Sequence, residues 1–159
     1  MDNINGNTTL VIKAVPLLYR AIVNAASAVQ HPLPSEMDAG RRTLVDAWRF
    51  YNNKGPVPGD KSVPQILLPS GGSDFQRFIS EAGVPVADMR MENAPLYTYT
   101  LYHTSYELPQ IVEQLIDPAF EAFSAVGKLW LSLAVDLADS LLIPFDVEGW
   151  YQSFTGFYD

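Results

Sequence analysis

The residues best able to do chemistry in this chain gather in one short stretch, from Tyr97 to Glu107. Four tyrosines there flank His103, and a histidine can act as an acid, a base or a metal ligand near neutral pH. The chain has two histidines, and the other, His31, precedes a proline and has no acidic neighbour closer than Glu36. His103 is therefore the candidate for metal binding or acid–base chemistry. The alternative is a partly buried histidine held by hydrogen bonds.

The composition excludes several classes of function. The chain has 159 residues, of which 48% are hydrophobic, and this is ample for a packed core. Its 10 basic and 18 acidic residues give a net charge of −8. Because clustered lysine and arginine are needed to bind phosphate backbones, we expect no nucleic-acid partner. The absence of cysteine excludes disulfides and thiolate ligands, so any metal must be bound by histidine and carboxylates.

Three features bear on targeting and modification. The polar start, Met1 to Asn7, lacks the basic and then apolar pattern of a secretory signal peptide. The apolar region 120–145 contains four charged side chains, each of which costs roughly 2.5–3.5 kcal/mol at the centre of a bilayer, so we expect a buried helix there. Asn7 begins an N-glycosylation sequon, which matters only if the protein is secreted.

The first half of the chain predicts a strand followed by helices. Residues 8–15 are rich in β-branched side chains and predict a strand that is buried on at least one face. A helix is expected over residues 16–29, with apolar positions 18, 22, 25 and 29 on one face. A second helix is expected after a Ser35 cap, with arginines 41, 42 and 49 on its exposed side.

The middle of the chain predicts two short strands around a glycine turn. Residues 52–61 hold two prolines and two glycines and predict a loop, while 63–68 and 84–91 predict strands. Between the strands, the turn enters a helix in which Ser73 and Gln76 have capping-box spacing. Gly83 is expected to end that helix in a left-handed conformation. Such a turn either binds a ligand or only connects strand to helix, and the order of elements predicts an α/β fold.

The last third of the chain predicts helices. Thr104 and Glu107 have capping-box spacing, whereas Pro109 favours a helix that starts slightly later. Asp117 is the expected N-cap of a long helix that ends before Pro144. Because its polar residues form one narrow stripe, we expect burial over most of its circumference. The stripe comprises positions 121, 125, 128, 132, 136 and 139. The aromatic residues after Pro144 predict the start of a further helix, and we expect the chain to stop within a domain.

Taken in order, these features resemble the C-terminal part of the protease domain of the glutamate carboxypeptidase II and transferrin receptor family of zinc-dependent peptidases. The resemblance covers nearly the whole chain. Its markers are Gly6-Asn7-Thr8-Thr9-Leu10, Pro16-Leu17-Leu18-Tyr19, Ser70-Gly71-Gly72-Ser73-Asp74-Phe75, Gly83-Val84-Pro85, Leu101-Tyr102-His103-Thr104-Ser105-Tyr106-Glu107, Asp117-Pro118 and Pro144-Phe145-Asp146. It implies part of a three-layer α/β/α zinc-exopeptidase domain over residues 1–108. Residues 109–159 would begin the helical domain through which known members dimerise.

The resemblance also implies roles for particular side chains. In that family two zinc ions share a bridging carboxylate and an activated water, a glutamate is the general base, and a tyrosine hydroxyl stabilises the oxyanion. By resemblance, His103 is the last zinc ligand and Tyr102 is the oxyanion donor. Gly72 and Ser73 would line the substrate cleft. Arg90 would face the substrate, the alternative for it being an ordinary surface arginine.

Several parts of the family's site have no counterpart in this chain. The family's other zinc-ligating histidine, bridging aspartate, general-base glutamate and neighbouring glutamate ligand all lie upstream. One further aspartate ligand corresponds to Asp2 if the loop before Gly6 is one residue shorter than usual; otherwise Met1 takes its position. The lysine and tyrosine that recognise a substrate carboxylate would lie beyond Asp159. We therefore expect a fragment that is inactive alone, because His103 and Asp2 cannot hold catalytic zinc by themselves.

The leading interpretation is a fragment of a carboxypeptidase that trims C-terminal residues, often acidic ones, from peptides and that dimerises through its helical region. Full-length relatives are membrane-anchored with an extracellular catalytic domain, and the localisation of this chain stays open. One alternative is a non-catalytic binding or scaffold protein like the transferrin receptor, although such a protein has no chemical reason to keep Tyr102 and His103. The other is a self-contained α/β domain in which His103 is merely packed.

Overall fold

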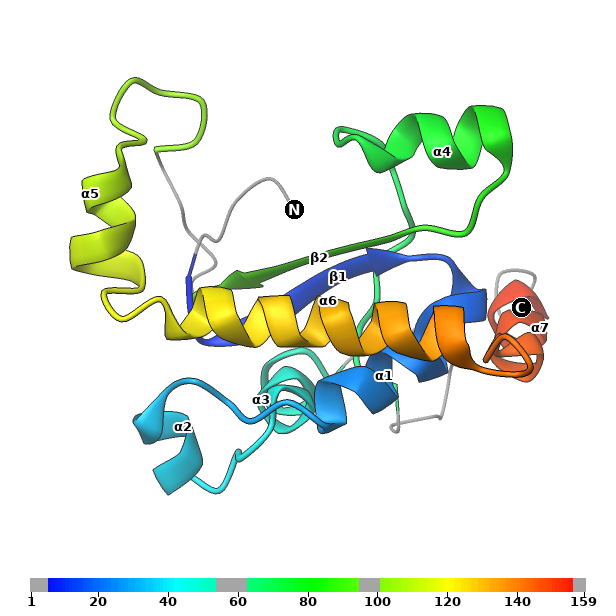
Figure 1. Ribbon diagram of the computed structural model, residues 1–159, viewed down its shortest axis with the longest axis horizontal. Coiled ribbons are helices and arrows are strands. Elements are labelled where there is room, and N and C mark those ends of the chain that lie inside the picture. The colour runs from blue at the N-terminus through cyan, green and yellow to red at the C-terminus, as the bar shows by residue number, and fades with distance from the viewer. Residues whose placement is uncertain (1–5, 54–62, 95–100, 156–159) are drawn as a thin grey trace.

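A computed structural model describes residues 6–53, 63–94 and 101–155 (Figure 1). At its centre, strand β1 (Thr9–Ala14) pairs antiparallel with strand β2 (Ala87–Glu92). The register places Thr9 opposite Glu92 and Ala14 opposite Ala87. Helices surround these two strands, and the mixed α/β class predicted from the sequence is confirmed.

One of the three predicted strands is wrong. The segment 63–68 is irregular and makes a single parallel bridge, between Leu67 and Lys13. On one side of this bridge Pro69 has no backbone N–H group to donate to β1. On the other side the N–H of Gln65 donates to Asn52 O, and the Asn52 side chain donates to Leu10 O, so the ladder does not extend. Strands β1 and β2 confirm the other two predicted strands, although β2 begins later than expected.

The first helical segment confirms its predicted apolar face. A 3-10 turn, η1 (Pro16–Leu18), leads into helix α1 (Tyr19–Ser27). The expected apolar positions are all buried: Leu18, Ile22, Ala25 and Val29. They join β1 and β2 in one hydrophobic cluster, so the periodicity of this segment correctly identifies the side that faces the core.

The predicted helix after Ser35 is wrong as a single element. The chain forms two short helices, α2 (Pro34–Asp38) and α3 (Leu44–Tyr51). Gly40 lies between them at φ +83°, a conformation that interrupts a helix and favours glycine. Thr43, not Ser35, caps α3: its hydroxyl accepts the N–H of Asp46, whose carboxylate accepts the N–H of Thr43 at 2.9 Å.

Helix α4 (Phe75–Ala82) follows the glycine turn, and Gly83 ends it at φ +64° as predicted. The expected capping box between Ser73 and Gln76 does not form. The Gln76 side-chain oxygen instead accepts the N–H of Gly72 at 3.4 Å and so closes the turn that precedes the helix.

The C-terminal third contains α5 (Pro109–Ile111), a π-helical turn η2 (Val112–Ile116), α6 (Glu121–Asp139) and α7 (Val147–Thr155). Of the two starts that the sequence left open, the helix takes the later one, at Pro109, and the last helix is confirmed. Asp117 is not the N-cap as predicted, because Phe120 takes that place at φ +54°. The Asp117 carboxylate still caps α6, because its two oxygens accept the N–H groups of Glu121 and Phe123 at 2.9 Å each.

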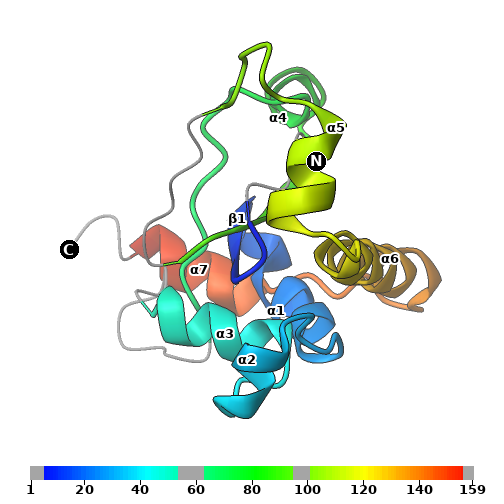
Figure 2. The same cartoon turned by 90° about the vertical axis from the view of Figure 1, so that its left-hand side faces the viewer.

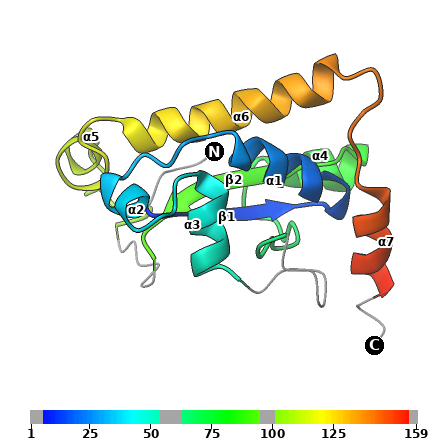
Figure 3. The ribbon, with the colours of Figure 1, turned by 90° about the horizontal axis from the view of Figure 1, so that it is seen from below.

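The prediction that this long helix is buried over most of its circumference is wrong. Helix α6 runs along the sheet beside β2 and packs on α1 with one face only (Figure 3). Ala125, which the sequence pattern assigned to the polar stripe, is 4% exposed, whereas Leu131 is 66% exposed. The burial of a helix depends on which elements pack against it, and the hydrophobicity of the helix alone does not predict these contacts. None of the described helices is long and apolar enough to cross a membrane.

The helices lie on both sides of the sheet. Figures 1 and 2 show α1, α2 and α3 on one side of β1 and β2, with α4 on the other. Strand residues alternate accordingly: Leu10, Ile12, Met89 and Met91 point into the core and are 1% exposed or less. The intervening residues of both strands therefore face the side on which α4 lies.

Helix α7 is attached to the rest of the molecule by a buried carboxylate. The backbone N–H of Asp146 donates to Leu17 O at 2.8 Å, and its side chain accepts the N–H of Gly149 at 2.9 Å at the start of α7. Arg20 of α1 forms an ion pair with the same carboxylate at 3.2 Å. The C-terminal helices therefore share contacts with the first part of the chain, and the boundary between residues 108 and 109 stays a prediction.

Candidate functional site

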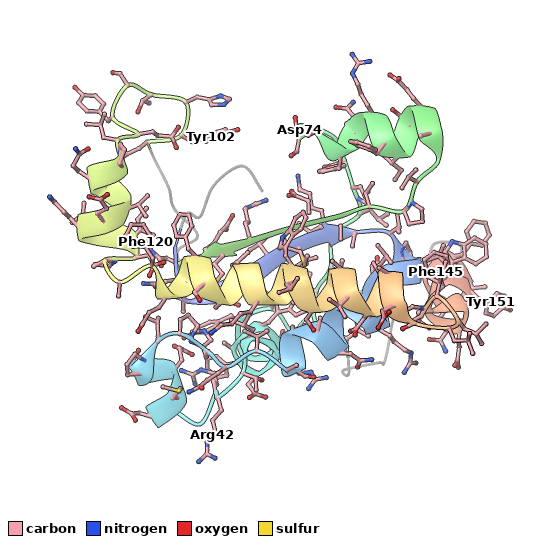
Figure 4. The ribbon with its side chains drawn as sticks, in the orientation of Figure 1. Arg42, Asp74, Tyr102, Phe120, Phe145 and Tyr151 are labelled. Carbon is pink, nitrogen blue, oxygen red and sulfur yellow. The ribbon has the colours of Figure 1, made fainter. Side chains whose placement is uncertain are left out.

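Three segments that carry predicted site residues lie on one side of the sheet. Figure 4 shows Tyr102, in the turn before α5, and Asp74, directly after the Gly72–Ser73 turn, on the side away from α1, α2 and α3. Arg90 belongs to the same face of β2, because its neighbours Met89 and Met91 point into the core. The fold thus brings the predicted residues to a common side from positions far apart in the sequence.

The turn before α5 holds Tyr102 and His103 together in solvent. Their rings stack at 3.9 Å between centroids and 20° between planes, and both side chains are exposed. His103 has φ +60°, which is uncommon for a residue other than glycine. Its backbone N–H donates to a Glu107 carboxylate oxygen at 2.8 Å, and the Thr104 hydroxyl donates to Leu101 O at 2.6 Å. These bonds hold His103 in a conformation that is otherwise unfavourable.

Other members of the predicted aromatic stretch, Tyr97 and Tyr99, lie outside the described residues, as does Asp2. Within residues 6–53, 63–94 and 101–155, no three histidine, aspartate or glutamate side chains are grouped so that they could hold a metal ion. A catalytic zinc is normally bound by three protein ligands. The described residues by themselves therefore do not fit a zinc site.

The glycine turn needs its glycines for backbone conformation. Gly71 and Gly72 have φ +89° and +84°. A Cβ built on Gly72 would meet nothing within 4 Å, so space does not explain this glycine. Ser73, the next residue, lies at the edge of a cavity between α4, β2 and α6.

Arg90, expected to face the substrate, is engaged within its own strand. Its Nε lies 2.6 Å from a Glu92 carboxylate oxygen, and both side chains are partly buried. The positive charge of Arg90 is therefore largely compensated before any substrate arrives. Its role in substrate binding stays a prediction.

The sequon asparagine has a structural role. The Asn7 side-chain amide donates to Ile116 O at 2.8 Å and so links the start of β1 to the end of η2. The Asn7 backbone N–H donates to the Asn93 side chain at 3.1 Å. Glycosylation of Asn7 stays a prediction.

The structure reveals a buried polar cluster that the sequence analysis missed. His31 is 2% exposed; its Nε2–H donates to Thr8 O at 2.9 Å, and its Nδ1 accepts the N–H of Leu33 at 3.1 Å. Glu36 is also buried and accepts hydrogen bonds from Arg41 and from the Tyr51 hydroxyl.

Arg41, which was expected on the exposed side of its helix, is partly buried instead. Its guanidinium lies over the Phe50 and Tyr51 rings, at 4.4 and 5.5 Å from their centroids, and it holds the pKa of Glu36 below its usual value. The sequence signal for this cluster was the regular spacing, five residues apart around a proline-rich turn, of His31, Glu36 and Arg41.

Acid is expected to destabilise the chain through His31. Burial is the main cause that lowers the pKa of His31 below 6.5, although Thr8 O and Glu36 oppose it. The unfolded chain therefore binds the proton more readily, so stability is complete above about pH 6.5 and is lost as the pH falls toward the lowered pKa. Each unit of lowering corresponds to roughly 1.4 kcal/mol. Urea unfolding from pH 8 to 5 measures this loss.

A matched pair of variants assigns the acid sensitivity. His31→Gln removes the titrating group and should flatten the profile between pH 5 and 7, whereas His103→Asn, at the exposed histidine, should preserve it. Below about pH 4.5 both variants should lose stability again, because Glu36 has a lowered pKa and becomes protonated there. A profile that flattens only in His103→Asn would contradict the assignment.

Comparisons with known proteins agree with the family markers. Over 149 residues the chain is 38% identical to a glutamate carboxypeptidase 2 homolog of Caenorhabditis elegans, a match that covers 92% of this chain and 19% of the relative. It is 28% identical over 156 residues to the aminopeptidase NAALADL1 of Rattus norvegicus, covering 95% of the chain and 20% of the relative. It is 30% identical over 133 residues to the probable glutamate carboxypeptidase LAMP1 of Arabidopsis thaliana, covering 84% of the chain and 17% of the relative. No protein-family model matches.

The chain has a mixed α/β fold, and its relatives are carboxypeptidases and an aminopeptidase. It is therefore a segment of a peptidase-family protein. The chain belongs to the glutamate carboxypeptidase family, and the family resemblance drawn from the sequence markers is confirmed. It spans about a fifth of the length of the curated relatives it matches.

Proposed function

We propose that this chain is a segment of a zinc-dependent carboxypeptidase that removes C-terminal residues from peptides. In this proposal His103 supplies one zinc ligand and Tyr102 donates its hydroxyl to the oxyanion that forms during hydrolysis. The observation that carries the proposal is the Tyr102–His103 pair: two stacked, exposed rings on a turn held at an uncommon φ. Uncommon backbone conformations of this kind cluster at functional sites.

The 159-residue chain by itself is proposed to be inactive. The described residues contain no group of three candidate metal ligands, and His103 with Asp2 would supply two at most. Two ligands leave a catalytic zinc short of its normal protein coordination. The remaining ligands and the general base are proposed to come from other parts of a longer polypeptide.

A chimera tests this proposal. The chain would replace the matching 149-residue segment of the C. elegans relative, with the unmodified relative as reference. We expect the chimera to bind zinc and to hydrolyse peptides from the C-terminus, and His103→Asn to lose both. The loss of zinc affinity should exceed the roughly 10–100-fold that is typical of losing an outer-shell partner. Asparagine is chosen because it tolerates the left-handed conformation of His103.

The same measurements on the chain alone complete the test. Ser105→Ala, in the same turn, is the control and should leave zinc content and hydrolysis unchanged. The isolated chain should show no zinc after dialysis and no change in melting temperature with added zinc. Tight zinc in the isolated chain, or a folded His103→Asn chimera that keeps its zinc, would contradict the proposal.

A second candidate, a binding or scaffold protein, is favoured by the exposed apolar surface of α6 and of the segment that follows it. Leu141 is fully exposed, Leu142 is 82% exposed and Leu131 is 66% exposed. Large exposed apolar patches commonly mark protein interfaces. We propose that this surface joins two copies of the chain, which is compatible with either function.

The association is testable by sedimentation of the purified chain over a range of concentrations. We expect a dimer that Leu141→Glu/Leu142→Glu converts to a monomer with unchanged circular dichroism, because burying two carboxylates opposes association. Leu115→Glu, at an exposed leucine of η2, is the control and should leave the dimer intact. A chain that stays monomeric at all concentrations would contradict the association.

A further inference from the structure

A cavity of about 330 Å³ lies between α4, β2 and α6. Its volume falls at the lower end of the range of small-molecule and side-chain pockets. Ten residues line it: Ser73, Asp74, Phe75, Phe78, Val84, Pro85, Val86, Ala87, Asp88 and Trp130. Three of them are aromatic and two are carboxylates, and none is a lysine or an arginine.

The apolar part of the wall is open to solvent. Phe78, Val84 and Trp130 are 59%, 45% and 42% exposed, although large apolar side chains gain by losing contact with water. Phe75, in contrast, is buried and forms a fixed floor from the first turn of α4. A ligand with an apolar body would cover the exposed parts of this wall.

The charged part of the wall consists of two aspartates. Among the described residues, neither Asp74 nor Asp88 forms an ion pair. Lys13 stands opposite Asp88 in the sheet register without forming such a pair, and Arg90 is already paired with Glu92. Figure 4 shows Asp74 at the start of α4. An acidic ligand would therefore meet two carboxylates, whereas a cation would be attracted to them.

We propose that this cavity binds the side chain of a lysine or arginine residue in a peptide. The aliphatic stem would pack on Phe75 and Trp130, and the cationic head would lie near Asp74 and Asp88. The inference rests on the proposed function in one respect, namely that the ligand is a peptide. Since Ser73 belongs to both the cavity and the predicted substrate turn, the cavity would select basic side chains next to that turn.

Three blocked amino acids test the proposal on the 159-residue chain: the Nα-acetyl methylamides of lysine, norleucine and glutamate. The indole N–H resonance of Trp130 reports binding, while those of Trp48 and Trp150 are internal references. We expect the lysine compound to bind roughly tenfold more tightly than the norleucine compound, the scale of one cation–π contact or charge-assisted hydrogen bond. The glutamate compound should bind least.

Two variants locate the charge effect. The double variant Asp74→Asn/Asp88→Asn should abolish the preference for lysine over norleucine, whereas Asp136→Asn, on an exposed part of α6 outside the cavity, should preserve it. Equal binding of lysine and norleucine by the unmodified chain would overturn the proposal. So would preferred binding of glutamate, or an unchanged Trp130 resonance with all three compounds.

This binding needs neither zinc nor hydrolysis, so the two proposals can fail separately. An inactive chimera with intact lysine binding would overturn the peptidase proposal alone. An active chimera without lysine preference would overturn the cavity proposal alone.

Discussion

Replacing Tyr102 by phenylalanine is expected to lower the kcat of the chimera with the C. elegans relative by roughly 10²–10³-fold, the usual effect of removing one oxyanion donor. The substitution removes the hydroxyl but keeps the ring, so the stacking on His103 at 3.9 Å should persist. Zinc content should therefore be unchanged, and KM should change little. Steady-state hydrolysis of a peptide substrate, together with metal analysis, measures all three quantities.

Tyr106→Phe provides the control for this prediction. Tyr106 lies in the same turn and is 69% exposed, so its hydroxyl should be dispensable for hydrolysis. If the two variants lose the same small amount of activity, Tyr102 is not the oxyanion donor. A large loss of zinc in Tyr102→Phe would instead indicate that the hydroxyl helps to hold the metal, and this would also contradict the proposed role.

Trp48→Ala is expected to cost about 3–5 kcal/mol of the free energy of unfolding, the usual effect of truncating a large buried aromatic side chain. Trp48 is fully buried in α3 and packs in the cluster that also contains Leu10 and Ile22. Such a loss is a large fraction of the stability of an ordinary domain. Denaturant unfolding of the chain, followed by circular dichroism, measures it.

Two further variants separate packing from hydrogen bonding at this position. Among the described residues, the Trp48 indole nitrogen has no hydrogen-bond partner, so Trp48→Phe should cost much less than Trp48→Ala. Trp150→Ala, at a half-exposed position of α7, should cost less than either. A Trp48→Phe variant as unstable as Trp48→Ala would contradict this expectation.

Local sequence patterns determined the parts of this fold that depend on local interactions. β-branched residues identified β1, and an apolar period of three to four identified the buried face of α1. Gly83 and Pro109 marked a helix end and a helix start because their backbone preferences act within a few residues. The order of short markers along the chain also identified the family, because such markers can be recognised without knowing which residues are in contact.

Capping and burial were predicted less well. Ser35 and Thr43 are both acceptable caps, but Ser35 lies inside α2, whose N-cap is Leu33, whereas Thr43 caps α3. The carboxylate of Asp117 caps α6 across a bend at Phe120 that no spacing rule indicates. In neither case did the spacing of polar residues identify the cap.

The sequence by itself determined the family, the fold class and the Tyr102–His103 pair as the residues to test. Only the tertiary structure decided which surfaces are buried, such as one face of α6 and the side chain of His31. It also decided that Arg90 pairs with Glu92 and that a cavity lies beside Ser73. The physical reason is that residue type and spacing act along the chain. Burial and charge compensation instead depend on which surfaces meet, and these surfaces belong to segments far apart in the sequence.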